Sequence, residues 1–91
     1  MHAALPGYEL VAEGLRYLQQ RRETVAALLV AIGAPRLSRL GIEMPAQLPH
    51  HPEHRLYTLL AQDDSDSAHS RYNALIRRLV SFERAAECVS R

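Results

Sequence analysis

Hydrophobic residues in the first third of the chain recur at steps of three, four and seven positions. This spacing places side chains on one face of an α-helix. The series is interrupted only by Arg22, a charge at a position that the pattern reserves for a hydrophobic residue. Gly33-Ala34-Pro35 follows, and a glycine before a proline is a typical helix stop. The pattern therefore predicts one long helix over about residues 8–32, whose face consists of Tyr8, Val11, Leu15, Leu18, Val25, Leu29 and Ile32, widened by Leu10, Tyr17 and Leu28.

Prolines divide the middle of the chain. Between about residues 34 and 51, Pro45 and Pro49 exclude a long regular element, although residues 35–40 allow a short helical turn closed by Gly41. Pro52 suits the first turn of a helix and predicts a second helix over about 52–62. We expect the connector to pack against the helices, because it carries the hydrophobic residues Leu37, Leu40, Ile42, Met44 and Leu48.

The last third of the chain repeats the helical pattern. Carboxylates and serines from Asp63 to Ser67 supply hydrogen-bond acceptors and negative charge for a helix start. A third helix is predicted over about 67–89, with a face of Tyr72, Leu75, Leu79, Phe82, Ala86 and Val89. The sequence thus predicts one all-α domain over residues 1–91. Its long, short and long helices would form an antiparallel hairpin or a small three-helix bundle.

Helices of about 25 residues are long for so small a chain, and a monomer would leave their hydrophobic faces half covered. We therefore expect a homodimer. A guanidinium in a dry core is costly without a partner, and a polar residue at such a position can set oligomeric state. The predicted interface contains Arg22, Leu18, Val25, Leu29, Leu75, Leu79 and Phe82.

Composition narrows the class of protein. The chain has 91 residues, is 47% hydrophobic and carries a net charge of +1, which argues against a polybasic protein. Every basic residue is arginine, which indicates coding in a GC-rich, bacterial genome. A single cysteine, Cys88, excludes an internal disulfide. Because neither a signal peptide nor a membrane span is evident, we expect a soluble cytoplasmic protein.

Histidines suggest the strongest candidate for metal chemistry. His50 and His54 are four residues apart, with His51 between them, and all three are weak candidate metal ligands. Pro52 directly after His51 disfavours a helical arrangement of the three, and no fourth ligand is nearby. We therefore expect no metal site and no cofactor. Motifs for nucleophilic catalysis, phosphate loops and zinc fingers are absent from the sequence.

The function predicted best is that of a non-enzymatic helical protein-interaction module, such as a regulator, chaperone or accessory subunit. The alternative is a dimeric nucleic-acid-associated regulator that uses the arginines of the last helix. A remote alternative is a small helical enzyme, since the order of helix lengths is similar to that of chorismate-mutase-like helical dimers. That resemblance would imply a carboxylate clamp of Arg16, Arg22 and Arg55. The lysine that those enzymes also use is absent, and we do not assign the chain to that family.

Overall fold

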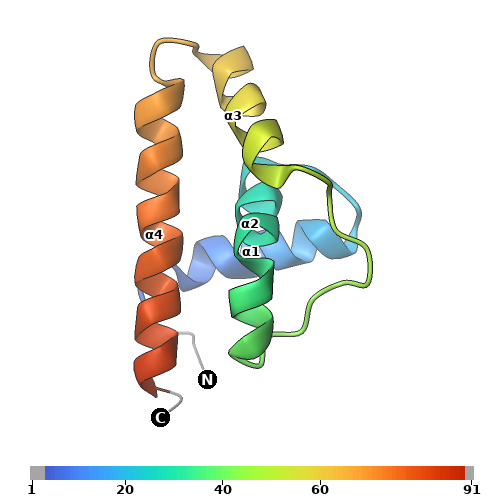
Figure 1. Ribbon diagram of the computed structural model, residues 1–91, viewed down its shortest axis with the longest axis vertical. Helices are drawn as coiled ribbons and strands as arrows, with labels where there is room; N and C mark the ends of the chain where they lie inside the picture. Colours follow the sequence, from blue (N-terminus) through green and yellow to red (C-terminus); the bar gives the residue numbers. More distant parts are fainter. Residues whose placement is uncertain (1–3, 90–91) are drawn as a thin grey trace.

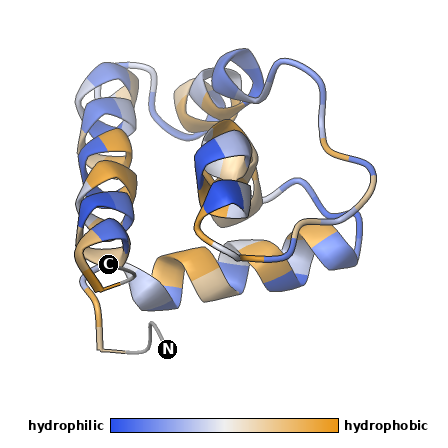
Figure 2. Cartoon of the chain, turned by 60° about the horizontal axis from the view of Figure 1, so that its bottom comes forward, coloured by the Kyte–Doolittle hydropathy of each residue, from blue (hydrophilic) through white to orange (hydrophobic). Residues whose placement is uncertain are grey.

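Four helices make up most of residues 4–89, the part of the chain that the computed structural model describes (Figure 1). They are α1 (Tyr8–Gln19), α2 (Val25–Arg39), α3 (Pro52–Asp63) and α4 (Ala68–Val89). Within residues 4–89 no strand occurs, so the predicted all-α class is confirmed. The predicted set of three helices is wrong. α4 flanks α2 and α3, while α1 crosses the other helices at a steep angle (Figures 1 and 2).

The helix predicted over 8–32 is interrupted between α1 and α2. Arg21 adopts a left-handed backbone with φ of 59°, and α1 has already ended at Gln19. Thr24 then caps α2, because its Oγ1 accepts a hydrogen bond from the N–H of Ala27 at 3.2 Å. Residues 20–23, between the two helices, are polar and exposed to solvent, so no hydrophobic burial favours continuing the helix through them. The chain folds back there, so that α1 packs against α2 within one molecule.

Gly14 allows α1 to pack closely against α2 where the chain folds back. It is buried in α1 where that helix crosses α2. A methyl group at Gly14 would lie 2.3 Å from the main-chain oxygen of Ala26 and 2.5 Å from Cγ2 of Val30. Those distances are far inside van der Waals contact, so α1 and α2 can approach this closely only because the residue has no side chain.

α2 is the central helix and packs against each of the other three. Residues 26–31 and Leu37 are buried, most of them completely. A helix that is hydrophobic almost all round is typical of a position enclosed by protein. Along α1 and α4, by contrast, hydrophilic and hydrophobic positions alternate (Figure 2).

The predicted stop at Gly33-Ala34-Pro35 is wrong, because α2 continues to Arg39. Gly33 lies inside the helix, where a methyl group would be 2.9 Å from Oε2 of Glu83 and 3.0 Å from Cδ2 of Leu79. Its role is therefore close packing of α4 and not a left-handed turn. The helix ends before Gly41, which has φ of 90°. The connector consequently spans residues 40–51 instead of the predicted 34–51.

The predictions for the second half of the chain agree with the structure. Helices predicted over 52–62 and 67–89 correspond to α3 and α4. On the predicted face of α4, Leu79, Phe82 and Ala86 are buried, whereas Val89 is 57% exposed. Amphipathic spacing therefore identified the packed face of α4 except at its last turn.

The residues predicted to form a dimer interface lie mostly in the core of the single chain. Leu18, Leu29, Leu79 and Phe82 are buried, and Val25 and Leu75 are half-buried. Arg22 is exposed in the turn after α1, with its guanidinium 4.8 Å from the centre of the Tyr17 ring. The prediction that Arg22 occupies a hydrophobic seam is wrong, because the helix ends before it. In this fold the buried residues are covered without a second chain, and homodimerisation stays a prediction.

Candidate binding site beside the proline-rich connector

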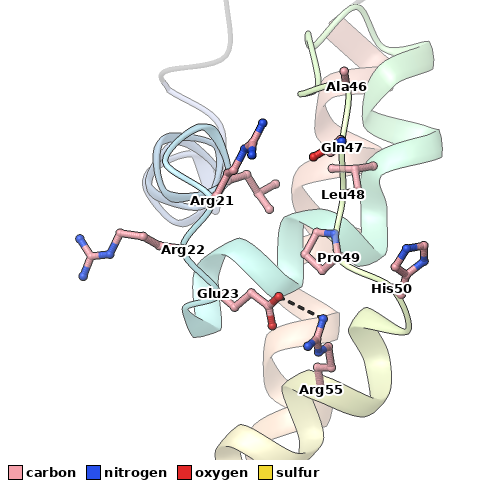
Figure 3. Close-up of a pocket in the computed structure, with 10 residues that line it drawn as sticks. Arg21, Arg22, Glu23, Ala46, Gln47, Leu48, Pro49, His50 and Arg55 are labelled. Atoms are coloured by element: carbon pink, nitrogen blue, oxygen red, sulfur yellow. Dashed lines mark ion pairs between the residues drawn. The ribbon is translucent and has the colours of Figure 1, made fainter.

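A hollow of about 580 Å³ lies where the α1–α2 turn faces the connector and the start of α3 (Figure 3). Three segments that are distant in sequence form its wall. The lining residues are Leu18, Arg21, Arg22, Glu23, Ala46, Gln47, Leu48, Pro49, His50 and Arg55. The sequence analysis named some of these residues separately. It did not predict that they line one hollow, because the local pattern of a segment does not show how far it lies from the other two.

The hollow has a hydrophobic side. Leu48 extends from the connector toward the end of α1 (Figure 3), where Leu18 is only 4% exposed. Leu48 itself is 36% exposed and, with Tyr57 and Val89, is one of the exposed large hydrophobic side chains of residues 4–89. Arg22 extends in the opposite direction, and His50 points away from α1 (Figure 3). The usable surface is thus bounded by Leu18, Leu48 and Arg21.

The charges around the hollow are unevenly paired. Nη1 of Arg55 lies 3.0 Å from Oε2 of Glu23, and both side chains are more than two-fifths exposed. Such a surface pair contributes little to stability, about 0–1 kcal/mol, but its charges cancel locally. Within residues 4–89, the Arg21 side chain forms no hydrogen bond or ion pair. Arg21 therefore presents an uncompensated positive charge beside hydrophobic surface.

The main chain of the connector is also unpaired. Among the residues that the structure describes, no hydrogen bond is donated or accepted by the main chain of residues 43–50. Ile42 is the last residue before this stretch to donate one, to the carbonyl of Leu37. Main-chain N–H and C=O groups almost always find a partner, and here that partner is solvent. A ligand in the hollow can therefore form hydrogen bonds with the main chain of the connector.

The three arginines considered for a carboxylate clamp each contact another side chain. The guanidinium carbons of Arg16 and Arg22 lie 5.3 and 4.8 Å from the centre of the Tyr17 ring. Arg55 is paired with Glu23 instead. The three arginines thus engage other groups, and only Arg22 and Arg55 line the hollow.

The three histidines lie together at the start of α3 but are all exposed. With Arg55 they line a shallow second hollow. Across residues 4–89, no three histidine, cysteine, aspartate or glutamate side chains are placed to hold a metal ion. His51 has φ of 52° and precedes α3 as its capping residue without a side-chain hydrogen bond. A guanidinium beside the imidazoles further opposes a cation.

The arginines on and beside α4 fall into two groups. Arg36 donates hydrogen bonds from Nη1 to Oε1 of Glu83 at 3.3 Å and from Nε to Oε2 of Glu87 at 3.2 Å, while Nη2 contacts Oε1 of Glu87. This cluster joins α2 to α4 and removes Arg36 from a phosphate-binding surface. By contrast, Arg77 and Arg84 are exposed on α4 and form no ion pair among the described residues. Arg91 lies outside the described residues.

Among residues 4–89, Glu83 is the one charged residue that is buried, at 4% exposure. Burial raises the pKa of Glu83; the Arg36 charge opposes this effect, and the nearby Glu87 adds to it. The Glu83 carboxylate therefore carries a desolvation penalty that Arg36 offsets only in part. Its role is structural, at the junction of α2 with α4 beside Gly33.

No family model, curated protein or solved structure matches this chain. Within residues 4–89, no helix combines the length and hydrophobicity that crossing a membrane requires. The fold and the site define only a structural class. Residues 4–89 form a small protein of four helices, with an open hollow that is partly hydrophobic and partly cationic and that lies beside a stretch of main chain without hydrogen bonds to other described residues.

Proposed function

We propose that this protein is a small non-enzymatic helical module that binds a partner protein, as a regulator, chaperone or accessory subunit. The observation that carries the proposal is the hollow beside the connector, where exposed Leu48 and the unpaired guanidinium of Arg21 meet. Exposed hydrophobic surface next to a charge is typical of protein-binding sites. The hollow is bounded by the α1–α2 turn and by the connector.

Its chemistry selects one kind of partner. A hydrophobic side chain fits between Leu18 and Leu48, and a carboxylate fits Arg21. The pair of Glu23 and Arg55 closes one end of the hollow without adding net charge. The partner is therefore expected to supply a short segment in which hydrophobic and acidic residues are neighbours.

A peptide titration tests this proposal. The probe is a short, end-capped peptide in which leucine alternates with glutamate, added to ¹⁵N-labelled protein and followed by NMR. We expect chemical-shift changes concentrated at Arg21, Gln47 and Leu48. A peptide with lysine in place of glutamate should bind more weakly, because Arg21 repels it. Absence of shifts at these residues up to millimolar peptide would overturn the proposal.

Two arginine variants form a matched pair for the same titration. Arg21→Gln removes the charge at the hollow and should weaken binding of the acidic peptide about fivefold, as expected for loss of ~1 kcal/mol from a surface charge contact. Arg39→Gln removes another exposed arginine, in the last turn of α2 and outside the hollow, and should leave binding unchanged. Equal effects of the two variants would indicate attraction by net charge alone.

A second candidate function is supported by the exposed face of α4. Arg77 and Arg84 are seven residues apart and so lie on one face, and Arg78 adjoins them. Such a row can contact nucleic-acid phosphates. A labelled DNA duplex at low salt tests this alternative, because affinity should fall steeply with added salt and with Arg77→Gln and Arg84→Gln together. Absence of binding at low salt would remove it.

A further inference from the structure

We infer that the partner segment binds as an added β-strand, hydrogen-bonded to the main chain of the connector at Leu48. This inference rests on the proposed function and specifies the conformation that the partner adopts. Addition of an extended segment to unpaired main chain is a general way of binding peptides. In that mode, backbone hydrogen bonds supply affinity and alternate side chains supply specificity.

The unpaired main chain points to this mode. Residues 43–50 neither donate nor accept a main-chain hydrogen bond within the described part of the chain. The chain bends at Ala46 and at His50, and the residues between the bends belong to no helix or turn. Pro49 also favours an extended backbone at Leu48, the residue before it. The connector thus offers a short, extended stretch whose polar groups meet only solvent.

Pro49 selects one of the two edges of this stretch. In an extended chain, the N–H and C=O groups of successive residues point to opposite sides. Gln47 and Pro49 therefore share one edge, and that edge lacks the N–H that proline cannot supply. The other edge carries the intact N–H and C=O of Leu48. A partner strand is expected to form its pair of hydrogen bonds there.

The hollow provides the space and the side-chain contacts for such a strand. Neighbouring strands lie about 4.8 Å apart, and side chains along a strand alternate between its two faces. A hydrophobic side chain on the face of the strand toward the end of α1 would lie against Leu18, and the positive charge of Arg21 favours a partner segment that also carries acidic residues.

A second copy of this chain fits the edge less well than an acidic partner does. Residues 43–50 contain one carboxylate, Glu43, which is five positions from Leu48, and Pro45 and Pro49 remove two donors from any pairing of one connector with another. We therefore commit to a segment of a different protein as the occupant.

Amide exchange measured by NMR tests the inference with the same leucine–glutamate peptide. At a peptide concentration about ten times Kd, exchange of the Leu48 amide should slow about tenfold, because only roughly one molecule in eleven is then free. The amide of Gln47 serves as the internal control and should exchange at its original rate. Peptides N-methylated at single positions should lose binding at every second position only.

The outcomes separate the inference from the proposed function. Shifts at Arg21 and Leu48 without protection of the Leu48 amide, or loss of binding at consecutive N-methylated positions, would overturn strand addition and leave the proposed function standing. Absence of any shift would remove both. Protection of the Leu48 amide in the free protein that increases with protein concentration would assign the edge to a second copy and overturn the choice of partner.

Discussion

Gly14→Ala tests the closest helix crossing in the molecule. Alanine normally stabilises a helix interior relative to glycine by about 0.5–1 kcal/mol. At Gly14 the added methyl group would lie 2.3 Å from the main-chain oxygen of Ala26, an atom that cannot rotate away. α1 would have to move away from α2, and overpacking of this kind costs about 1–3 kcal/mol, with contacts to backbone at the upper end. The net expectation is a loss of about 1–2 kcal/mol in the free energy of unfolding.

Gly33→Ala is the matched control, because it adds the same methyl group inside a helix. There the nearest atoms are Oε2 of Glu83 at 2.9 Å and Cδ2 of Leu79 at 3.0 Å, the ends of side chains that can adjust. The gain in helix propensity should offset most of the crowding, so the change in the free energy of unfolding should stay within about 1 kcal/mol.

Thermal unfolding followed by circular dichroism measures both variants. For a domain of this size, 1 kcal/mol corresponds to a shift in Tm of about 4–8 °C, so Gly14→Ala should lower Tm by roughly 10 °C. Gly33→Ala should change Tm by a few degrees at most. A Tm for Gly14→Ala equal to or above that of the wild type would refute the tight crossing of α1 and α2. Equal losses in the two variants would refute the distinction between backbone and side-chain contacts.

Three further predictions follow from burial and charge. Because burial raises the pKa of Glu83 against the opposing charge of Arg36, the folded protein holds this proton more tightly than the unfolded chain, and the contribution of Glu83 to stability falls as pH rises above about 4.5. In urea titrations, the free energy of unfolding of Glu83→Gln should rise relative to that of the wild type as pH increases above about 4.5, and a pH-independent difference would contradict this. Leu79→Ala should cost about 2–4 kcal/mol, because Leu79 is 3% exposed, whereas Leu48→Ala should cost less than about 1 kcal/mol; equal costs would show that the connector belongs to the core. Arg22→Leu should leave the oligomeric state measured by sedimentation velocity unchanged, since Arg22 is exposed outside the helices. The homodimer expected from the sequence would need a surface other than the predicted one, which is mostly buried in the single chain, and a monomeric wild type at high micromolar concentration would contradict it.

The bounds of α3 and α4 were predictable from the sequence because their signals are local. Pro52 fits the first turn of α3, and the acidic and serine residues after Asp63 separate it from α4. Amphipathic spacing identified the buried face around Leu79 and Phe82. Each of these signals depends on residues within one or two helical turns of each other.

The break between α1 and α2 was missed although the sequence contains a signal for it. Val25 follows Leu18 by seven residues, so the hydrophobic spacing continues across the turn as if the helix did. Thr24 could have identified the start of α2, since threonine before a hydrophobic run is a preferred capping residue. The prediction followed the hydrophobic periodicity instead of the capping signal of Thr24. It therefore assigned Arg22 to the hydrophobic face of one continuous helix, which the structure does not contain.

The candidate site could not be predicted in the same way. Leu48, Arg55 and the proline-rich connector were recognised separately, but nothing local relates them to Arg21. Their convergence depends on the direction in which the chain reverses after α1 and on the approach that Gly14 permits.

The sequence by itself determined the helical class, the bounds of α3 and α4 and the end of the connector at Pro52, because spacing, capping residues and prolines act over a few residues. The tertiary structure alone decided the fold-back of α1, the passage of α2 through Pro35 and the hollow at Arg21. Gly33 shows the physical reason. In the sequence, Gly33 before Ala34-Pro35 resembles a helix stop. In the structure it lies inside α2, where it allows close packing of α4, whose contacting residues are more than forty positions later in the chain. Contacts between distant segments outweigh local propensity, and a single sequence does not show which segments will meet.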